Sequence, residues 1–190
     1  MQVWKPLINR CNDFVGQVPS PDMQSLPDLL RQCTDWVAGL EVIRENLPWG
    51  RYLVHADPGE RFNIQLDVFS PGYRGGLHAH KTWGMIWALR GGLFVEDWHE
   101  SDGRFSMLRQ GWFAAGCGQV FAPPQSDWHR VSSPPAGPQT VSIHIYGQGF
   151  DLDEGIKRED DGRVVTYKRG PFANGEELIG AVRQRNPAVA

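Results

Sequence analysis

The chain has 190 residues, a formal net charge of −3 and a pI near 6.1. This length allows one domain with a substantial core, and the weak acidity gives no electrostatic basis for binding nucleic acid or an anionic membrane. Three widely spaced cysteines without a CxxC pair indicate neither a disulfide framework nor a zinc cluster. No apolar run approaches the roughly 20 residues of a membrane span, and the first residues lack a signal-peptide pattern. We therefore expect a cytoplasmic protein without nucleic-acid or membrane partners, as a monomer or homodimer.

Residues 1–50 predict a helical segment that packs on the rest of the chain. Apolar residues recur at helical spacing from Leu29 to Ile43, and Ser25 or Asp28 can cap the start of that helix. The sequence LPWG at 47–50 ends the segment. We expect this segment to form part of a single domain.

Residues 51–170 have a different pattern, with short alternating runs separated by turns. Runs such as RFNIQLDVF, LFVEDWH and TVSIHIYG recur about every 8–12 residues, with Gly, Pro, Asp and Ser between them. This pattern predicts an antiparallel β-sandwich or barrel. Residues 171–190 form a tail in which Asn174 can cap a short helix.

Two histidines, His78 and His80, are separated by one residue in GYRGGLHAHKTWGMIWALRGG. On a strand, residues i and i+2 point the same way, so both imidazoles can reach one ion. Such a pair also occurs by chance on exposed strands, so the neighbouring sequence is needed to decide whether it binds a metal ion. Gly72 and Gly92 flank it, and a second run, GQVFAPPQSDWHRVSS, carries His129.

The two runs fit G-x5-H-x-H-x4-[E]-x6-G and G-x5-P-x-[G]-x2-H-x3-[N], and they resemble the two motifs of the cupin superfamily. The resemblance implies a jelly-roll antiparallel barrel with a metal ion held by His78, His80 and His129. Met85 stands where the first motif has its glutamate. Because a thioether is a poor ligand for hard divalent ions, we expect three neutral imidazoles and no carboxylate, a centre that attracts an anionic thiolate.

The run TVSIHIYG, residues 140–147, places Ser142, His144 and Tyr146 on one face of a strand. Taken alone, this row is equally compatible with an ordinary exposed face. After three metal-binding histidines, however, S-x-H-x-Y resembles the serine–histidine–tyrosine relay of the thiol dioxygenases, the cysteine dioxygenase and 3-mercaptopropionate dioxygenase family. HAHKTWG resembles its bacterial branch, and the resemblance covers roughly residues 50–150.

This resemblance implies a ferrous iron (Fe²⁺) cofactor and addition of both atoms of dioxygen to a small thiol, giving a sulfinate. Tyr146 would hydrogen-bond the oxygen or the substrate at the metal, while His144 and Ser142 would fix its hydroxyl proton. Mammalian-type cysteine dioxygenases carry a cysteine at the position of Met85, cross-linked to the tyrosine. Tyr146 is therefore expected to be a free phenol.

The residues that contact the substrate are expected around this centre. Arg51 is the nearest match to the arginine that pairs with the substrate carboxylate in cysteine-oxidising members, although the match needs a one-residue shift. Ungapped matching turns Gln65, Asp67 and Phe69 inward. Met85 and Trp87 are expected to point inward as well, depending on the register that the turn at 81–83 imposes.

An inward carboxylate and a tryptophan suit a cationic or betaine thiol such as ergothioneine, through ion pairing and cation–π contact. Cysteine or 3-mercaptopropionate, bound through Arg51, are the alternatives. The alternative is that Asp67 pairs with a neighbouring arginine and that Trp87 lies in the core.

Two other function classes remain. A metal-dependent isomerase or hydrolase with Zn, Ni or Mn would use the same histidines but has no need for Ser142, His144 and Tyr146. A non-catalytic cupin would bind a small molecule without turnover. Metal analysis distinguishes the first class from a dioxygenase, and oxygen consumption distinguishes the second.

Overall fold

The structure is a computed structural model that describes residues 4–16, 28, 47–121, 128–148 and 154–168, together with the backbone of 173–174. The helix expected from Leu29 to Ile43 and the helix expected after Asn174 lie outside the described residues. One N-terminal helix is described, α1 (Lys5–Val15).

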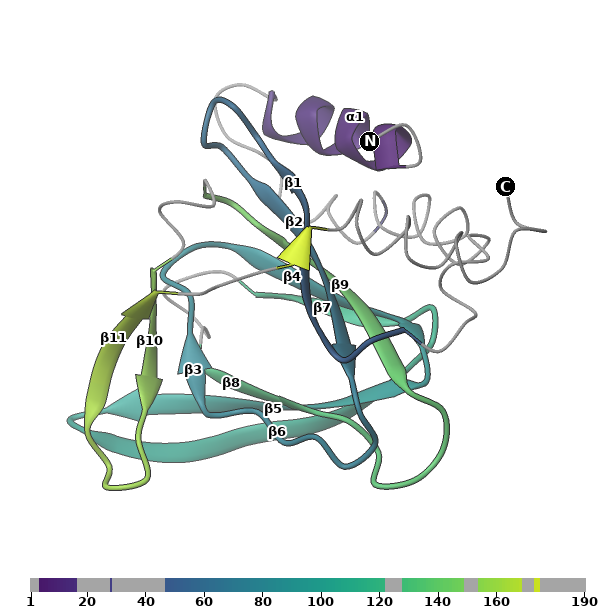
Figure 1. The fold of residues 1–190 in the computed structure, drawn as a ribbon. Coiled ribbons are helices and arrows are strands. Elements are labelled where there is room, and N and C mark those ends of the chain that lie inside the picture. The colour runs from purple at the N-terminus through teal and green to yellow at the C-terminus, as the bar shows by residue number, and fades with distance from the viewer. Residues whose placement is uncertain are drawn as a thin grey trace.

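Twelve described strands form two six-stranded sheets (Figure 1). The first sheet has the order β12 (Ala173–Asn174), β1 (Gly50–Ala56), β2 (Asn63–Phe69), β9 (Thr140–Tyr146), β4 (Gly84–Arg90), β7 (Gly118–Phe121). The second has the order β11 (Val164–Lys168), β10 (Glu154–Arg158), β3 (His78–Ala79), β8 (His129–Ser132), β5 (Gly92–Ser101), β6 (Arg104–Ala114). The pair β1–β12 is parallel, whereas the other pairs are antiparallel.

The connections between the sheets define the fold. Successive strands from β2 to β9 alternate between the sheets except at the hairpin β5–β6, which gives the orders β2-β9-β4-β7 and β3-β8-β5-β6. This order is that of a two-sheet jelly roll. Strands β1 and β12 extend the first sheet, and the hairpin β10–β11 extends the second. The expected mainly β, antiparallel jelly roll with an N-terminal helix is confirmed.

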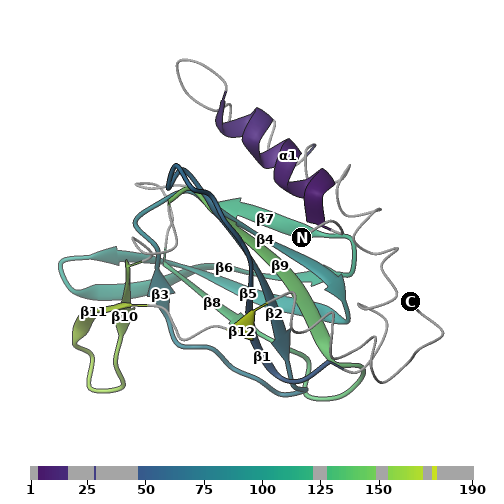
Figure 2. The ribbon, with the colours of Figure 1, turned by 45° about the horizontal axis from the view of Figure 1, so that its top comes forward.

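The inner strands of the first sheet are covered on both faces. All seven residues of β2 and all seven of β9 are buried. One face, with Leu66, Met85 and Ile143, packs in a core with Leu7 and Phe14 of α1, and Figure 2 shows α1 lying over this sheet. The other face points between the two sheets. The polar residues of β9 therefore face the barrel interior, while its apolar residues pack under the helix.

Local sequence explains why α1 forms at this place. A proline occupies the first turn, where its missing N–H costs no hydrogen bond, and Leu7, Cys11 and Phe14 repeat at helical spacing and are buried. The edge of Phe14 packs on Trp83 at 5.5 Å between ring centroids. These contacts fix the helix on the outer face of the sheet.

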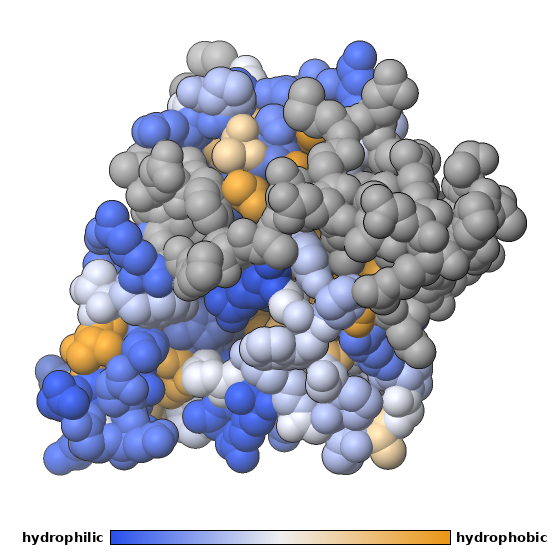
Figure 3. Space-filling view, viewed as in Figure 1, coloured by the Kyte–Doolittle hydropathy of each residue, from blue (hydrophilic) through white to orange (hydrophobic). Residues whose placement is uncertain are grey.

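The hairpin β10–β11 lies at the opposite end of the molecule from α1 and presents mostly hydrophilic residues in the space-filling view (Figure 3, lower left). Its turn contains the ion pair between Arg163 Nε and Asp161 Oδ2, 2.6 Å apart. Among the described residues, no helix is both long and apolar enough to cross a membrane.

Candidate metal centre

Three histidines meet between the two sheets. His78 begins β3 and lies opposite His129 of β8 in the antiparallel pair, and His80 follows two residues after His78. Their candidate ligand atoms all lie within 4.8 Å of one another, and Nε2 of His80 is 3.2 Å from Nε2 of His129. The expected convergence of the HxH pair and the later histidine is therefore present in the structure.

This spacing fits a divalent metal ion. Imidazole nitrogens bind such ions at about 2.0–2.1 Å, which in tetrahedral geometry places the nitrogens about 3.3 Å from one another. The Nδ1 atom of His78 lies 2.9 Å from the carbonyl oxygen of Gly76. An N–H donated to that carbonyl leaves Nε2 of His78 as the ligand atom, an arrangement common among metal-binding histidines. The three histidines can hold a metal ion.

Aromatic rings close one side of the cluster. Phe121 stacks on His80 and Tyr146 lies over the same imidazole, with ring centroids 5.2 and 4.5 Å away. On the inner face of β5, Asp97 lies opposite His129 and forms an ion pair with Arg109. Asp97 is not among the convergent ligand groups of the described residues, so the three-imidazole set contains no carboxylate.

The expectation that Met85 and Trp87 face the site is wrong. Both side chains lie in the core shared with α1. The two-residue period counted from His80 reaches positions 84, 86 and 88, and Ile86 and Ala88 accordingly pack in the same cluster as Tyr146. Gly84 is the residue opposite Tyr146 in the β4–β9 pair. A glycine, which has no side chain, therefore occupies the β4 position beside Tyr146.

Ser142, His144 and Tyr146 form a continuous series of hydrogen bonds on the inner face of β9. Ser142 Oγ lies 2.8 Å from Nε2 of His144, and Nδ1 of His144 lies 3.0 Å from the Tyr146 hydroxyl. All three residues are buried. The order of the three groups along one strand follows directly from the two-residue period of β structure.

Burial lowers the pKa of His144 below its ordinary value, opposed by the carboxylate of Asp67 and reinforced by the charge of Arg51. His144 is therefore neutral near pH 7, with a single N–H. When Nδ1–H donates to Tyr146, the Ser142 hydroxyl donates to Nε2, and the phenol keeps its own proton for the cavity. In the other tautomer both hydrogen bonds reverse direction. The series can therefore move a proton at the phenol oxygen.

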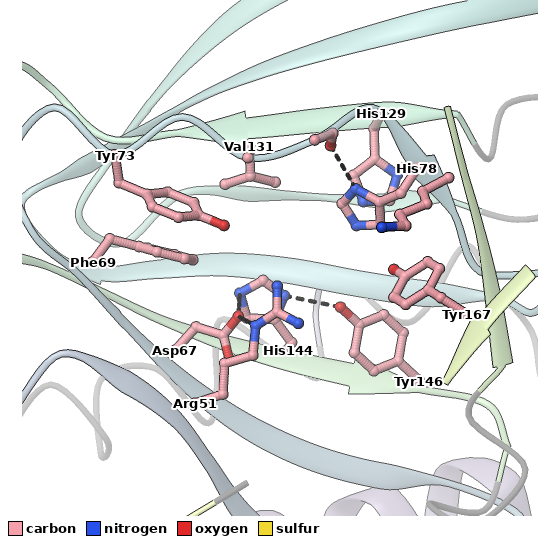
Figure 4. A pocket seen from close by; sticks show the side chains of 13 residues that line it. Arg51, Asp67, Phe69, Tyr73, His78, His129, Val131, His144, Tyr146 and Tyr167 are labelled. Carbon is pink, nitrogen blue, oxygen red and sulfur yellow. Dashed lines mark hydrogen bonds and ion pairs between the residues drawn. The ribbon is translucent and has the colours of Figure 1, made fainter. Parts of the chain in front are cut away.

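The series opens into a cavity of about 160 Å³ next to the histidines (Figure 4). Its lining consists of Arg51, Asp67, Phe69, Tyr73, Gly75, Gly76, His78, His129, Val131, His144, Tyr146, Lys157 and Tyr167. This volume is below the roughly 300–1,000 Å³ of sites for drug-sized ligands. The cavity therefore suits a small metabolite.

Arg51 and Asp67 form one wall as an ion pair. They lie opposite each other in the β1–β2 pair, with Nε of Arg51 3.4 Å from Oδ2 of Asp67, and their side chains are 40% and 5% exposed. Burial by itself lowers the pKa of Arg51, but the charges of Asp67 and of nearby tyrosines outweigh it and raise the pKa above its ordinary value. The carboxylate lies behind the guanidinium, and the guanidinium is the more accessible group.

Of the other residues expected to contact the substrate, Phe69 lines the cavity and Gln65 does not. Gln65 points inward but is buried, and its side-chain amide donates to Asn63 Oδ1 at 2.7 Å. The alternation rule placed this residue on the correct face, whereas its depth depends on how neighbouring strands cover it.

Sequence reasoning missed six residues that line the cavity: the glycines Gly75 and Gly76, and the side chains of Tyr73, Val131, Lys157 and Tyr167. Val131 lies two residues after His129 on β8, so alternation could have identified it. Tyr73, whose hydroxyl points into the cavity in Figure 4, lies in a loop. Lys157 and Tyr167 reach the cavity because β10 pairs with β3, which no local pattern indicates.

No family model matches the chain. It is similar to several solved structures. One is a protein of unknown function with a cupin-like fold from Ralstonia eutropha, with 16% identity over 72% of this chain and 74% of that chain and a TM-score of 0.45. A second, from Bacillus halodurans, has 15% identity over 74% and 88% and a TM-score of 0.49. The capsular polysaccharide assembling protein CapF of Staphylococcus aureus has 17% identity over 68% of this chain and 33% of that chain, with a TM-score of 0.44.

Proposed function

We propose that the protein is a thiol dioxygenase that adds both atoms of dioxygen to the sulfur of a small thiol, giving a sulfinate. The observation that carries this proposal is the buried series Ser142–His144–Tyr146, which meets the three-histidine cluster in one small cavity. The histidines alone suit several divalent ions and reactions. A metal ion can bind to the histidines without the series. Oxygen transfer to sulfur, in contrast, requires a group that can donate a proton or a hydrogen bond to developing negative charge.

His78, His80 and His129 would hold the cofactor, for which we propose ferrous iron. Ferrous iron would supply the electrons that activate dioxygen and a site at which thiolate and dioxygen come together. Three neutral imidazoles leave both positive charges of the ion uncompensated, which favours binding of a thiolate. Phe121 and Tyr146 pack over His80 and keep water from that side of the cluster.

Tyr146 would stabilise charge that develops on oxygen during the reaction. Its hydroxyl lies on the cavity wall, and a hydroxyl held in place before the reaction stabilises such charge without reorganisation. His144 holds that hydroxyl in place through its bond of 3.0 Å, and Ser142 holds the imidazole of His144 through its bond of 2.8 Å. The roles of these three residues therefore depend on one another.

The wall formed by Arg51 and Asp67 favours an acidic substrate over a cationic one. Asp67 is buried and already paired with Arg51, and Trp87 lies outside the cavity in the core. A betaine thiol such as ergothioneine would thus lack both contacts that would recognise its cation. The exposed guanidinium can bind a carboxylate, so we favour a carboxylate-bearing thiol such as cysteine or 3-mercaptopropionate.

The test is oxygen uptake by protein loaded anaerobically with ferrous iron, with cysteine, 3-mercaptopropionate, mercaptosuccinate and ergothioneine as substrates. We expect one dioxygen consumed per thiol and formation of the sulfinate, detected by mass spectrometry. The absence of uptake with every thiol, at one iron per chain, would contradict the proposal and favour a different metal-dependent reaction.

Tyr146→Phe tests the hydrogen-bonded series. We expect the variant to keep its iron and to lose turnover by about 10- to 1,000-fold, as when one preorganised donor to a developing oxyanion is removed. Tyr52→Phe is the matched control, because the Tyr52 hydroxyl is also hydrogen-bonded, to the carbonyl oxygen of Pro48 at 2.9 Å, but lies outside the cavity. Unchanged turnover in Tyr146→Phe would remove the series from the mechanism.

A further inference from the structure

A hairpin late in the chain completes the wall of the cavity on the side of the histidines. In the β10–β3 pair, Lys157 lies directly opposite His78. Directly opposite residues of an antiparallel pair project to the same face of the sheet. Lys157 and His78 accordingly both line the cavity, together with Tyr167 from β11. Figure 4 shows Tyr167 at the end of the cavity near His78 and Tyr146.

Lys157 carries an ammonium group whose present partner is easily replaced. Its Nζ lies 2.9 Å from Oε1 of Glu159, and the two side chains are 41% and 38% exposed. Ion pairs this accessible to water contribute little to stability. Nζ also lies 6.0 Å from the centroid of the Tyr167 ring, at the limit of a cation–π contact. A better-placed acidic group can therefore displace Glu159.

Apart from the histidines, three charged side chains line the cavity among the described residues: Arg51, Asp67 and Lys157. Asp67 and Arg51 compensate each other, which leaves Lys157 as the cation whose charge no lining residue compensates. Arg51 comes from the first sheet and Lys157 from the second. Two cationic groups thus stand on different walls around the position where a substrate would bind.

We propose that Lys157 binds a second acidic group of the substrate, so that the preferred substrate is a small thiol with two carboxylates. This inference rests on the proposed function. Arg51 binds one carboxylate and Lys157 binds the other, with the sulfur placed at the histidine cluster between them. Lys157 is thereby a specificity-determining residue, contributed by a strand that pairs with the strand of His78.

Two thiols that differ by one carboxylate test the assignment. Mercaptosuccinate is 3-mercaptopropionate with a second carboxylate on the carbon that bears the sulfur. We expect Lys157→Gln to lower kcat/KM for mercaptosuccinate by about 10- to 100-fold, the usual effect of losing a charge-assisted hydrogen bond, mostly through KM. For 3-mercaptopropionate the change is expected to stay within about 2-fold, and Lys157→Arg restores most of the mercaptosuccinate activity because it keeps the charge.

Lys168→Gln is the matched control. Lys168 lies on β11 of the same hairpin, is exposed, and does not line the cavity, so both thiols should react as with the unmodified protein. Calorimetric titration of the metal-free protein with succinate, which has two carboxylates and no sulfur, gives a readout independent of turnover. Succinate should bind more weakly to Lys157→Gln, by a factor similar to that seen with mercaptosuccinate.

The outcomes separate this inference from the proposed function. Equal losses with both thiols in Lys157→Gln would overturn the inference, because Lys157 would then bind the single carboxylate or act structurally. Oxidation of 3-mercaptopropionate but not of mercaptosuccinate by the unmodified protein would also overturn it, while the dioxygenase proposal stands. Oxidation of neither thiol, nor of any other, would refute the function and the inference together.

Discussion

The close contact between Gly84 and the aromatic rings behind the histidines gives a sharp prediction for Gly84→Ala. Gly84 lies opposite both Tyr146 and Phe121 in the first sheet. A Cβ atom at Gly84 would lie 2.3 and 2.6 Å from two ring carbons of Phe121 and 2.9 Å from a ring carbon of Tyr146. Carbon atoms pack at about 3.5–4.0 Å, so the Phe121 ring must move by about 1 Å or more.

Neither ring can move freely. Phe121 and Tyr146 are both buried, and both pack on His80. Inserting a methyl group into such a core costs about 1–3 kcal/mol, which corresponds to a melting temperature lower by about 2–12 °C for a domain of this size. Displacement of Tyr146 would also lengthen its hydrogen bond to His144. We therefore expect turnover to fall even at temperatures where the variant is fully folded.

Thermal and urea unfolding, followed by oxygen uptake at equal iron content, measure the two effects. Gly76→Ala is the control for stability, because no heavy atom lies within 4 Å of a Cβ placed there. We expect Gly76→Ala to unfold within a few degrees of the unmodified protein. Full stability and full turnover in Gly84→Ala would contradict this reasoning, because they would mean that Gly84 does not face the rings of Tyr146 and Phe121.

Three further predictions test the site and its support. His129→Ala should lose most bound iron in metal analysis, and full occupancy would remove it from the ligand set. Because burial lowers the pKa of His144, the unfolded chain takes up a proton below about pH 6.5 that the folded chain resists, so the free energy of unfolding falls toward acid. His144→Gln should flatten that slope in urea titrations, and an identical slope would contradict the assignment. Leu7→Ala should cost about 2–5 kcal/mol in urea unfolding, because Leu7 is buried between α1 and the first sheet; no loss would mean that α1 does not pack there.

Some features of the protein follow from the sequence alone because they depend on local periodicity. Alternation along a strand places Ser142, His144 and Tyr146 on one face, and the spacing of turns predicts an antiparallel β fold. Resemblance to known motifs brought His129 together with the HxH pair. These predictions needed no knowledge of which strands become neighbours.

Other features were decided by the tertiary structure. The pairing of β4 with β9 places Gly84, and not Met85, beside Tyr146, and Met85 packs in the core under α1. Asp67 becomes the partner of Arg51 only when β1 pairs with β2.

Pairing between distant strands also explains why the sequence analysis missed Lys157. Lys157 enters the cavity because β10 pairs with the edge of β3, where Lys157 lies opposite His78, a residue far earlier in the chain. Pairing between strands so far apart is determined by the packing of the whole barrel, which lies beyond the reach of local patterns. The sequence thus determined the chemistry on each strand, and the tertiary structure decided which of those groups share one cavity.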